Sequence, residues 1–177
     1  MNIILCGYKT SGKSTLAQAY SKAYACEYID TDRLLIDLYK KNNGVQKTIG
    51  EIYQEYGGFE FRKLEFKALQ LVKNIDDAII AIGGGTVLNA ACVSYLKTLG
   101  SIFYLNVSKK ILANRLAKLK VRPSFINNIA ADDDIKRYLY SRDENYLTVA
   151  DYVINPNGKS IKELVSILYQ YRCDYGQ

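Results

Sequence analysis

A glycine-rich octapeptide near the start of the sequence has the spacing of a phosphate-binding loop. Residues 7–14 read GYKTSGKS and fit the pattern G-x-x-x-x-G-K-[ST]. In such a loop the glycines permit tight turns, backbone N–H groups point at phosphate oxygens, and a helix N-terminus adds positive charge. Lys13 is expected to reach the β- and γ-phosphates, and the Ser14 hydroxyl to ligate Mg²⁺. The alternative is an ordinary strand-to-helix turn with an incidental lysine.

Two carboxylates, Asp30 and Asp32, follow the second apolar segment of the chain. In a parallel sheet the carboxyl ends of the strands meet at one edge, so both residues are expected near the phosphate loop. Phosphoryl transfer needs a metal clamp and a group that orients or deprotonates the attacking hydroxyl. We therefore expect Asp30 to hold Mg²⁺ through water and Asp32 to accept the proton. The alternative is a helix N-cap by Thr31 or Asp32, which is compatible with catalysis.

Arginines placed later in the chain are suited to bind an anionic acceptor. Arg62 and Glu65 are three positions apart on a predicted helix, so Glu65 can hold Arg62 in a fixed orientation. Arg142 lies on another predicted helix and is suited to pair with a substrate carboxylate through two hydrogen bonds. The alternative for each of these residues is a solvated surface position.

Two loops complete the candidate site. The triplet Gly83–Gly85 ends a strongly apolar segment and would let a ligand approach the backbone closely; the alternative is a tight turn. The stretch 120–133 has the composition of a lid or binding loop. Arg122 lies in this stretch and, as a lid arginine, would contact the transferring phosphoryl group; its alternative is a surface position.

The composition narrows the class of protein. The chain has 177 residues, no histidine and a formal charge of +6, which excludes Ser–His and Cys–His catalysis and favours an anionic partner. Its cysteines have no metal-binding spacing and are expected to be reduced. No N-K-x-D tetrapeptide for guanine occurs, and motors are usually longer, so a small-molecule kinase remains. No apolar run reaches the length of a membrane span, and we expect no signal segment because Met1 runs directly into an apolar stretch.

Apolar segments alternate with helical patterns along the chain. The predicted strands are Asn2–Cys6, Tyr28–Ile29, Ala78–Ile82, Ile102–Asn106 and Tyr152–Ile154. The predicted helices are Lys13–Tyr24, Asp32–Lys41, Ile49–Tyr56, Phe59–Val72, Val87–Leu99, Lys109–Leu119, Asp134–Thr148 and Ile161–Tyr171. This alternation predicts an α/β three-layer sandwich in which helices cover both faces of a five-stranded parallel sheet.

The segment from Lys109 to Arg122 has six basic residues and no acidic residue. A nucleic-acid surface is one interpretation. An amphipathic helix with lysines facing solvent is the other, and positive charge near a nucleotide site also attracts ATP. We expect the second, and therefore no nucleic-acid partner.

The motifs, taken in order, resemble those of the shikimate kinase family. They are G-x-x-x-x-G-K-S-T, D-T-D, F-R-x-x-E, G-G-G, R-L, R-P and R-x-x-x-Y-x-x-x-A-D, which here are Gly7–Thr15, Asp30–Asp32, Phe61–Glu65, Gly83–Gly85, Arg115–Leu116, Arg122–Pro123 and Arg142–Asp151. The resemblance is collinear over about residues 3–156. It implies a P-loop fold similar to the nucleoside monophosphate kinases, with a lid, and ATP-dependent phosphorylation of the 3-hydroxyl of shikimate in aromatic amino-acid biosynthesis.

The resemblance also implies roles for individual residues. The shikimate-binding positions are Asp32, Arg62, Gly84 and Arg142. The nucleotide-side positions are Gly7, Thr10, Ser11, Gly12, Lys13, Ser14, Thr15, Arg115, Arg122 and Asn155, where Asn155 belongs to a segment, Asn155–Asn157, near adenine. Ser14 and Asp30 match the Mg²⁺ positions, and Lys13, Asp32 and Arg122 the catalytic ones. One departure is Lys9, which adds a charge near the phosphates where the family commonly has Met-Gly.

We therefore expect a single P-loop kinase domain over residues 1–177, with an acceptor-binding helical region at about 32–72 and the lid at about 120–133. The expected partners are shikimate and ATP with Mg²⁺, in a cytoplasmic monomer without a membrane or nucleic-acid partner. Two alternatives remain. One is a kinase of the same fold for another small acid such as gluconate, and the other is a non-catalytic nucleotide-binding relative.

Overall fold

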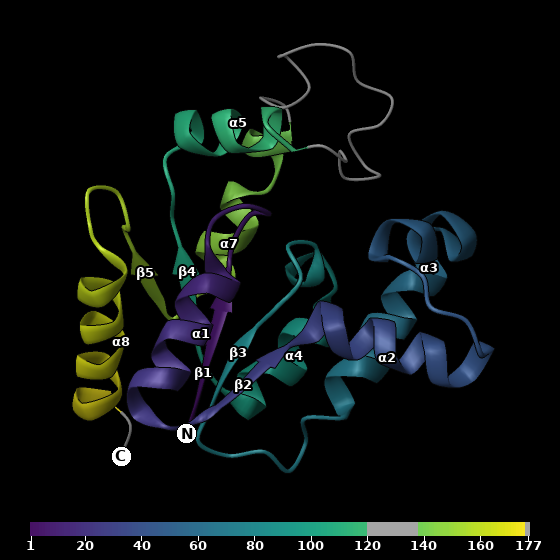
Figure 1. The fold of residues 1–177 in the computed structure, drawn as a ribbon, viewed down its shortest axis with the longest axis horizontal. Coiled ribbons are helices and arrows are strands. Elements are labelled where there is room, and N and C mark those ends of the chain that lie inside the picture. Colours follow the sequence, from purple (N-terminus) through teal and green to yellow (C-terminus); the bar gives the residue numbers. More distant parts are fainter. Residues whose placement is uncertain (120–137, 176–177) are drawn as a thin grey trace.

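The computed structural model describes residues 1–119 and 138–175. Its centre is a five-stranded parallel sheet in the order β2-β3-β1-β4-β5 (Figure 1). The strands are β1 (Asn2–Cys6), β2 (Glu27–Asp30), β3 (Ala78–Ala81), β4 (Gly100–Leu105) and β5 (Tyr152–Ile154). β1 lies in the middle and is buried along its whole length, as expected of a parallel strand covered on both faces.

Helices cover both faces of this sheet. They are α1 (Lys13–Tyr24), α2 (Thr31–Asn43), α3 (Ile49–Gln70), α4 (Ala90–Leu99), α5 (Lys109–Ala117), α7 (Asp143–Val149) and α8 (Ile161–Tyr175). α1 packs on β3 and α8, whereas α4 packs on β4 from the opposite face (Figure 1). The predicted α/β sandwich is confirmed.

Helices α2 and α3 extend to one side of the sheet (Figure 1) and have a small hydrophobic cluster of their own. Its buried members are Leu35, Tyr39, Ile52, Phe61, Leu64 and Ala68. α3 begins with a capping box between Thr48 and Glu51 and is kinked at Gly57, which has a φ of 69°. The two helices predicted around this glycine pair are therefore joined end to end across a kink.

Two predicted helices are wrong in extent. The pattern predicts one helix over Val87–Leu99, but Thr86–Leu88 forms a separate 3₁₀ turn (η1), and α4 starts only after Asn89, whose side chain accepts a hydrogen bond from the N–H of Ala91. It also predicts one helix over Asp134–Thr148, but the helical residues 138–141 are separated from α7 by a turn at Arg142. The first residues of that range, like the lid at 120–133, lie outside the described residues. In the part of the chain that the structure describes, no helix has the length and apolarity needed to span a membrane.

Candidate active site

A cavity of about 1040 Å³ lies at the carboxyl ends of the strands and brings most of the predicted site residues together. Those that line it are Thr10, Ser11, Gly12, Lys13, Ser14, Thr15, Asp30, Asp32, Arg62, Glu65, Gly84, Arg115 and Arg142. Gly7 and Asn155 do not line the cavity, and Arg122 lies outside the described residues. This is the ligand position expected for an open α/β sheet.

The loop between β1 and α1 has the backbone of a phosphate cradle. Gly7 and Gly12 have φ values of 141° and 97°, which disfavour side chains, and Thr10 also has a positive φ of 67°. A Cβ on Gly7 would lie 3.1 Å from the carbonyl oxygen of Leu105, so the loop packs tightly on the end of β4. The N–H groups at the start of α1 face the cavity from this loop and supply an anion site.

The Lys13 side chain is buried beneath the phosphate loop. Its Nζ donates hydrogen bonds to the carbonyl oxygens of Gly7 and Tyr8, both at 2.8 Å. Burial lowers the pKa of Lys13 to about 8, against the opposing influence of Asp32. An anionic ligand in the loop would stabilise the ammonium form, because it supplies the negative charge that the buried group lacks.

Ser14 and Asp30 form the pair of oxygen donors predicted for a metal. The Ser14 hydroxyl donates to Asp30 Oδ2 at 3.1 Å, and the Tyr28 hydroxyl donates to the same atom at 3.0 Å. The other oxygen, Oδ1, accepts the backbone N–H of Asp32 at 3.0 Å. Asp30 is thus the N-cap of α2, and the predicted capping by Thr31 or Asp32 is wrong, because the helix begins one residue earlier than expected.

This donor pair suits Mg²⁺. Mg²⁺ is usually held by one or two protein oxygens, with phosphate oxygens and water completing an octahedron. One carboxylate and one hydroxyl beside the phosphate loop match that requirement. Within residues 1–119 and 138–175 there is no group of three or more His, Cys, Asp or Glu residues that would form a metal cage without phosphate.

Asp32 faces the same cavity from the first turn of α2. Its Oδ1 would lie only 2.6 Å from a Cβ on Gly83, so the carboxylate packs directly on the glycine triplet. Burial, followed by the negative charge of Asp30, raises the pKa of Asp32 to about 6, and Lys13 opposes this increase. A carboxylate of this kind is ionised at neutral pH and more basic than an exposed one, as a general base requires.

Arg62 and Glu65 form a partly buried ion pair on α3, in which Glu65 is buried and Arg62 is half-buried. Glu65 is 6% exposed and also accepts a hydrogen bond from the Thr86 hydroxyl at 3.2 Å. The Arg62 guanidinium lies against Gly85, where a Cβ would be 2.6 Å from it. Burial raises the pKa of Glu65, whereas Arg62 lowers it. Glu65 therefore fixes Arg62 at the cavity wall, as predicted from their spacing.

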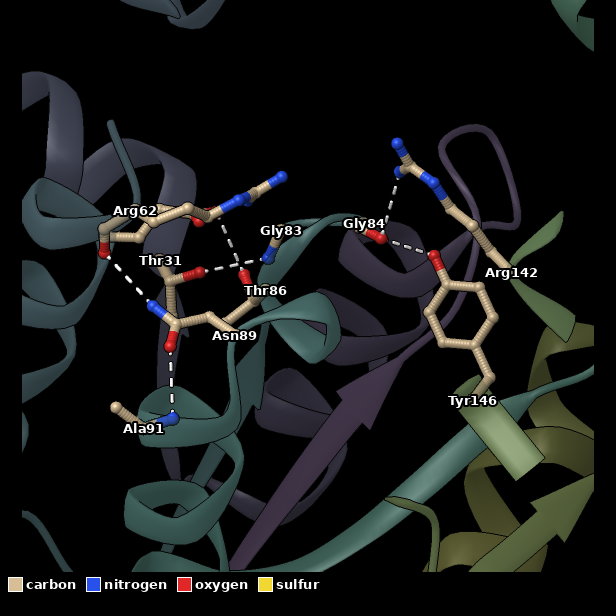
Figure 2. Close-up of polar contacts among 10 residues, drawn as sticks. Thr31, Arg62, Gly83, Gly84, Thr86, Asn89, Ala91, Arg142 and Tyr146 are labelled. Atoms are coloured by element: carbon tan, nitrogen blue, oxygen red, sulfur yellow. Dashed lines mark hydrogen bonds and ion pairs between the residues drawn. The ribbon is translucent and has the colours of Figure 1, made fainter. Parts of the chain in front are cut away.

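Arg142 reaches the glycine triplet from the opposite side. Its Nη1 donates to the Gly84 carbonyl oxygen at 3.5 Å, and the buried Tyr146 hydroxyl donates to the same oxygen (Figure 2). The guanidinium lies 4.6 Å from the centre of the Tyr138 ring. The glycine triplet thus lies between Arg62 and Arg142 (Figure 2), and both cations line the same cavity as Asp32.

Several lining residues were not predicted. Thr48, Gly50 and Tyr53 form a wall from the start of α3, and Tyr146 supports Gly84 from beneath. Only the tyrosine in the R-x-x-x-Y spacing carried a sequence signal. The other wall residues reach the cavity because α3 folds back over α2, which no local pattern reveals.

The nucleotide side shows one further difference from expectation. Arg115, on α5, donates to the Thr10 carbonyl oxygen at 2.9 Å and so contacts the phosphate loop as expected. After β5, however, Asn157 rather than Asn155 lines the cavity. The Asn155 side chain accepts hydrogen bonds from Asn157 and thereby shapes the loop.

Several known proteins that are similar to this chain in sequence are described as shikimate kinases. A family model described as shikimate kinase matches residues 9–171. The chain is 36% identical over 121 residues to the shikimate kinase of Chloroherpeton thalassium, covering 68% of this chain and 62% of that protein. It is 32% identical over 165 residues to that of Caldanaerobacter subterraneus subsp. tengcongensis, covering 92% and 91%. The structure of shikimate kinase from Acinetobacter baumannii in complex with shikimate superimposes with a TM-score of 0.82 at 26% identity, covering 98% and 93%.

Proposed function

The chain belongs to the shikimate kinase family, and from that premise we propose that its cavity transfers the γ-phosphoryl group of ATP to the 3-hydroxyl of shikimate. One observation carries the proposal. A phosphate loop, a basic carboxylate and two arginines line one cavity of a single chain. ATP and an anionic polyol therefore fit end to end, with Asp32 between them.

The acceptor's groups match the residues opposite the phosphate loop. Shikimate has one carboxylate, which suits Arg62 and Arg142, and three hydroxyls, one of which would bond to Asp32. A neutral sugar would offer no carboxylate to either guanidinium group, and the loss of such contacts penalises a wrong substrate.

The transfer step follows from these positions. Asp32 accepts the proton of the 3-hydroxyl, whose oxygen forms a bond to the γ-phosphorus. The bond between that phosphorus and the bridging oxygen breaks, and ADP leaves with the electron pair. Lys13 and the N–H groups of the loop bind the phosphate oxygens. Ser14 and Asp30 would hold Mg²⁺, which when bound neutralises charge on the β- and γ-phosphates.

The remaining expectations complete the proposal. The cavity is lined by residues from Lys9 to Leu164, which supports a single P-loop kinase domain. We also propose that this domain works as a monomer. The four free cysteines support a reducing compartment such as the cytoplasm. The apolar side chains of α5 are buried and its Arg115 contacts the phosphate loop, which supports a role in nucleotide binding rather than nucleic-acid binding.

The position of phosphorylation tests the proposal directly. The protein is incubated with ATP, Mg²⁺ and shikimate, and the product is analysed by phosphorus–proton correlation NMR. We expect a single monoester whose phosphorus couples to the proton at carbon 3. Coupling to the proton at carbon 4 or 5 would place a different hydroxyl against Asp32 and refute the proposed geometry.

Arg142→Ala is expected to lower kcat/KM for shikimate by roughly tenfold to hundredfold, because a hydrogen-bonded charge contact is lost. Most of the loss should be in KM. Methyl shikimate, which lacks the carboxylate charge, provides the matched comparison. The wild type should strongly prefer shikimate to this ester, and Arg142→Ala should reduce the preference. An unchanged preference in the variant would show that Arg142 does not bind the carboxylate.

At low concentrations of both substrates, the rate of phosphorylation is expected to have a bell-shaped dependence on pH. Asp32 accepts a proton only when ionised, so the rate should fall as the pH falls below its pKa of about 6. Lys13 binds phosphate best when charged, so the rate should also fall as the pH rises above its pKa of about 8. Initial rates between pH 5 and 9, with samples returned to pH 7 to confirm reversibility, measure both limbs. A flat profile between pH 5 and 7 would contradict the role of Asp32.

A further inference from the structure

Lys9 lies where the nucleotide and acceptor sides of the cavity meet. It is the third residue of the phosphate loop, and its exposed side chain lines the cavity. Its backbone nitrogen would lie 3.4 Å from a Cβ on Gly84. Because the Gly84 carbonyl oxygen accepts a hydrogen bond from Arg142, Lys9 is the loop residue next to the proposed acceptor position.

The ammonium group of Lys9 has no hydrogen bond or ion pair with any residue that the structure describes. Four of the cavity's other cations are engaged: Lys13 bonds the loop carbonyls, Arg62 pairs with Glu65, Arg115 bonds Thr10 and Arg142 bonds Gly84. Lys159 also lines the cavity, but it lies in the loop after β5, away from the phosphate loop in sequence. Lys9 nevertheless acts electrostatically on both sides. After the larger effect of burial, its charge contributes to the lowered pKa of Lys13, and it opposes the raised pKa of Asp32.

Phosphoryl transfer creates a need for positive charge at this junction. As the γ-phosphoryl group moves, negative charge shifts toward an acceptor side that already contains the carboxylates of Asp32 and Glu65. The product is a phosphomonoester next to Asp32, and the two negative charges repel strongly once Asp32 has released the proton that it accepted. Arg62 and Arg142 are assigned to the substrate carboxylate, and Lys13 to the nucleotide phosphates. Among the described residues of the phosphate loop, this leaves Lys9 as the cation that could act on the transferred phosphate, together with the lid arginine expected at Arg122.

We propose that Lys9 is this phosphate-binding residue on the acceptor side, where its ammonium binds the transferred phosphoryl group and the phosphate of the bound product. The inference deepens the proposed function and rests on it. It assigns Lys9 to the acceptor side of the transferred group, whereas Lys13, which is buried beneath the loop, is proposed to bind the same group from the nucleotide side. The site would thus have one lysine for each side of the transfer.

Lys9→Met tests the inference, with Lys9→Arg as the conservative variant and Lys22→Met as the control. Lys22 is an exposed lysine in the last turn of α1 and does not line the cavity, so its loss changes the net charge equally. Calorimetry without nucleotide gives the Kd values of shikimate and of its 3-phosphate for each protein. Steady-state assays give kcat and the KM for ATP.

In Lys9→Met the Kd of the 3-phosphate is expected to rise by roughly tenfold or more, since a charge-assisted contact is lost, while the Kd of shikimate changes by less than about twofold. The kcat should also fall. Lys9→Arg should retain most of the affinity for the product, and Lys22→Met should match the wild type.

Three results would overturn the inference. An unchanged product Kd would remove Lys9 from the phosphate. Equal weakening of shikimate and its 3-phosphate would indicate a general electrostatic effect. A loss confined to the KM for ATP would place Lys9 on the nucleotide side. Failure of the proposed function itself is distinguishable, because the wild type would then form no 3-phosphate.

Discussion

Asp32→Asn is expected to lower kcat by roughly 10²–10⁴-fold, the range that a positioned general base contributes. The substitution preserves the size of the side chain that packs on Gly83 but removes its basicity. It also removes one of two neighbouring negative charges, because Asp30 remains. Nucleotide affinity should therefore persist, and the acidic limb of the pH profile should disappear. Pre-steady-state formation of ADP measures the chemical step separately from product release.

The matched control for Asp32→Asn is Asp37→Asn, an exposed position on the same helix that does not line the cavity. It should have wild-type kinetics. If Asp32→Asn retained turnover near the wild-type value, the proton would leave the acceptor by another route. The assignment of Asp32 as base would then be wrong, even though shikimate phosphorylation would stand.

Lys13→Met is expected to lower kcat by roughly 10²–10³-fold, the cost of losing one preorganised donor to the developing charge, and also to weaken binding of the triphosphate. Methionine has a similar length but no charge and no donor. The carbonyl oxygens of Gly7 and Tyr8 would lose their hydrogen bonds, so the loop itself should also become less ordered. Steady-state kinetics and calorimetric titration with an ATP analogue measure the two effects.

Thermal unfolding separates these effects from a loss of fold. Lys118→Met, an exposed lysine beyond the end of α5, removes the same charge outside the cavity and should leave kcat unchanged. Lys13→Met should remain folded, because the sheet beneath the loop does not depend on Lys13. A folded variant with wild-type kcat and triphosphate affinity would show that the buried lysine never leaves the loop carbonyls.

The central elements of the fold are readable from the sequence because their signals are local. β1 contains the apolar run Ile3–Cys6, which ends at the glycine loop, and the bounds of α1 agree with the prediction. The asparagine that caps α4 also carries a signal, but the apolar pair before it extends the helical pattern backwards. The break at Arg142 has no local signal, since neither glycine nor proline lies there. At that point Arg142 and Tyr146 bond Gly84, a contact between distant segments.

The sequence likewise predicts some features of the candidate site and does not reveal others. Residue types and spacing indicate Lys13 and Asp32, and the resemblance to the family adds Arg62 and Arg142 to the same site; all four line the cavity. Spacing does not reveal that Lys13 lies against its own loop carbonyls. Nor does it reveal that Asp32 packs on Gly83 or that its pKa is raised, because both features depend on segments that are distant in sequence.

ADP formation in the presence of ATP and Mg²⁺ tests the central claim most directly when shikimate is compared with gluconate, quinate, nucleoside monophosphates and no acceptor. We predict rapid ADP formation with shikimate alone, with one shikimate 3-phosphate formed per ADP. A rate with shikimate no higher than that without an acceptor, from a protein that still binds ATP, would contradict the account. The cavity would then be a nucleotide site whose acceptor is another small acid or a protein.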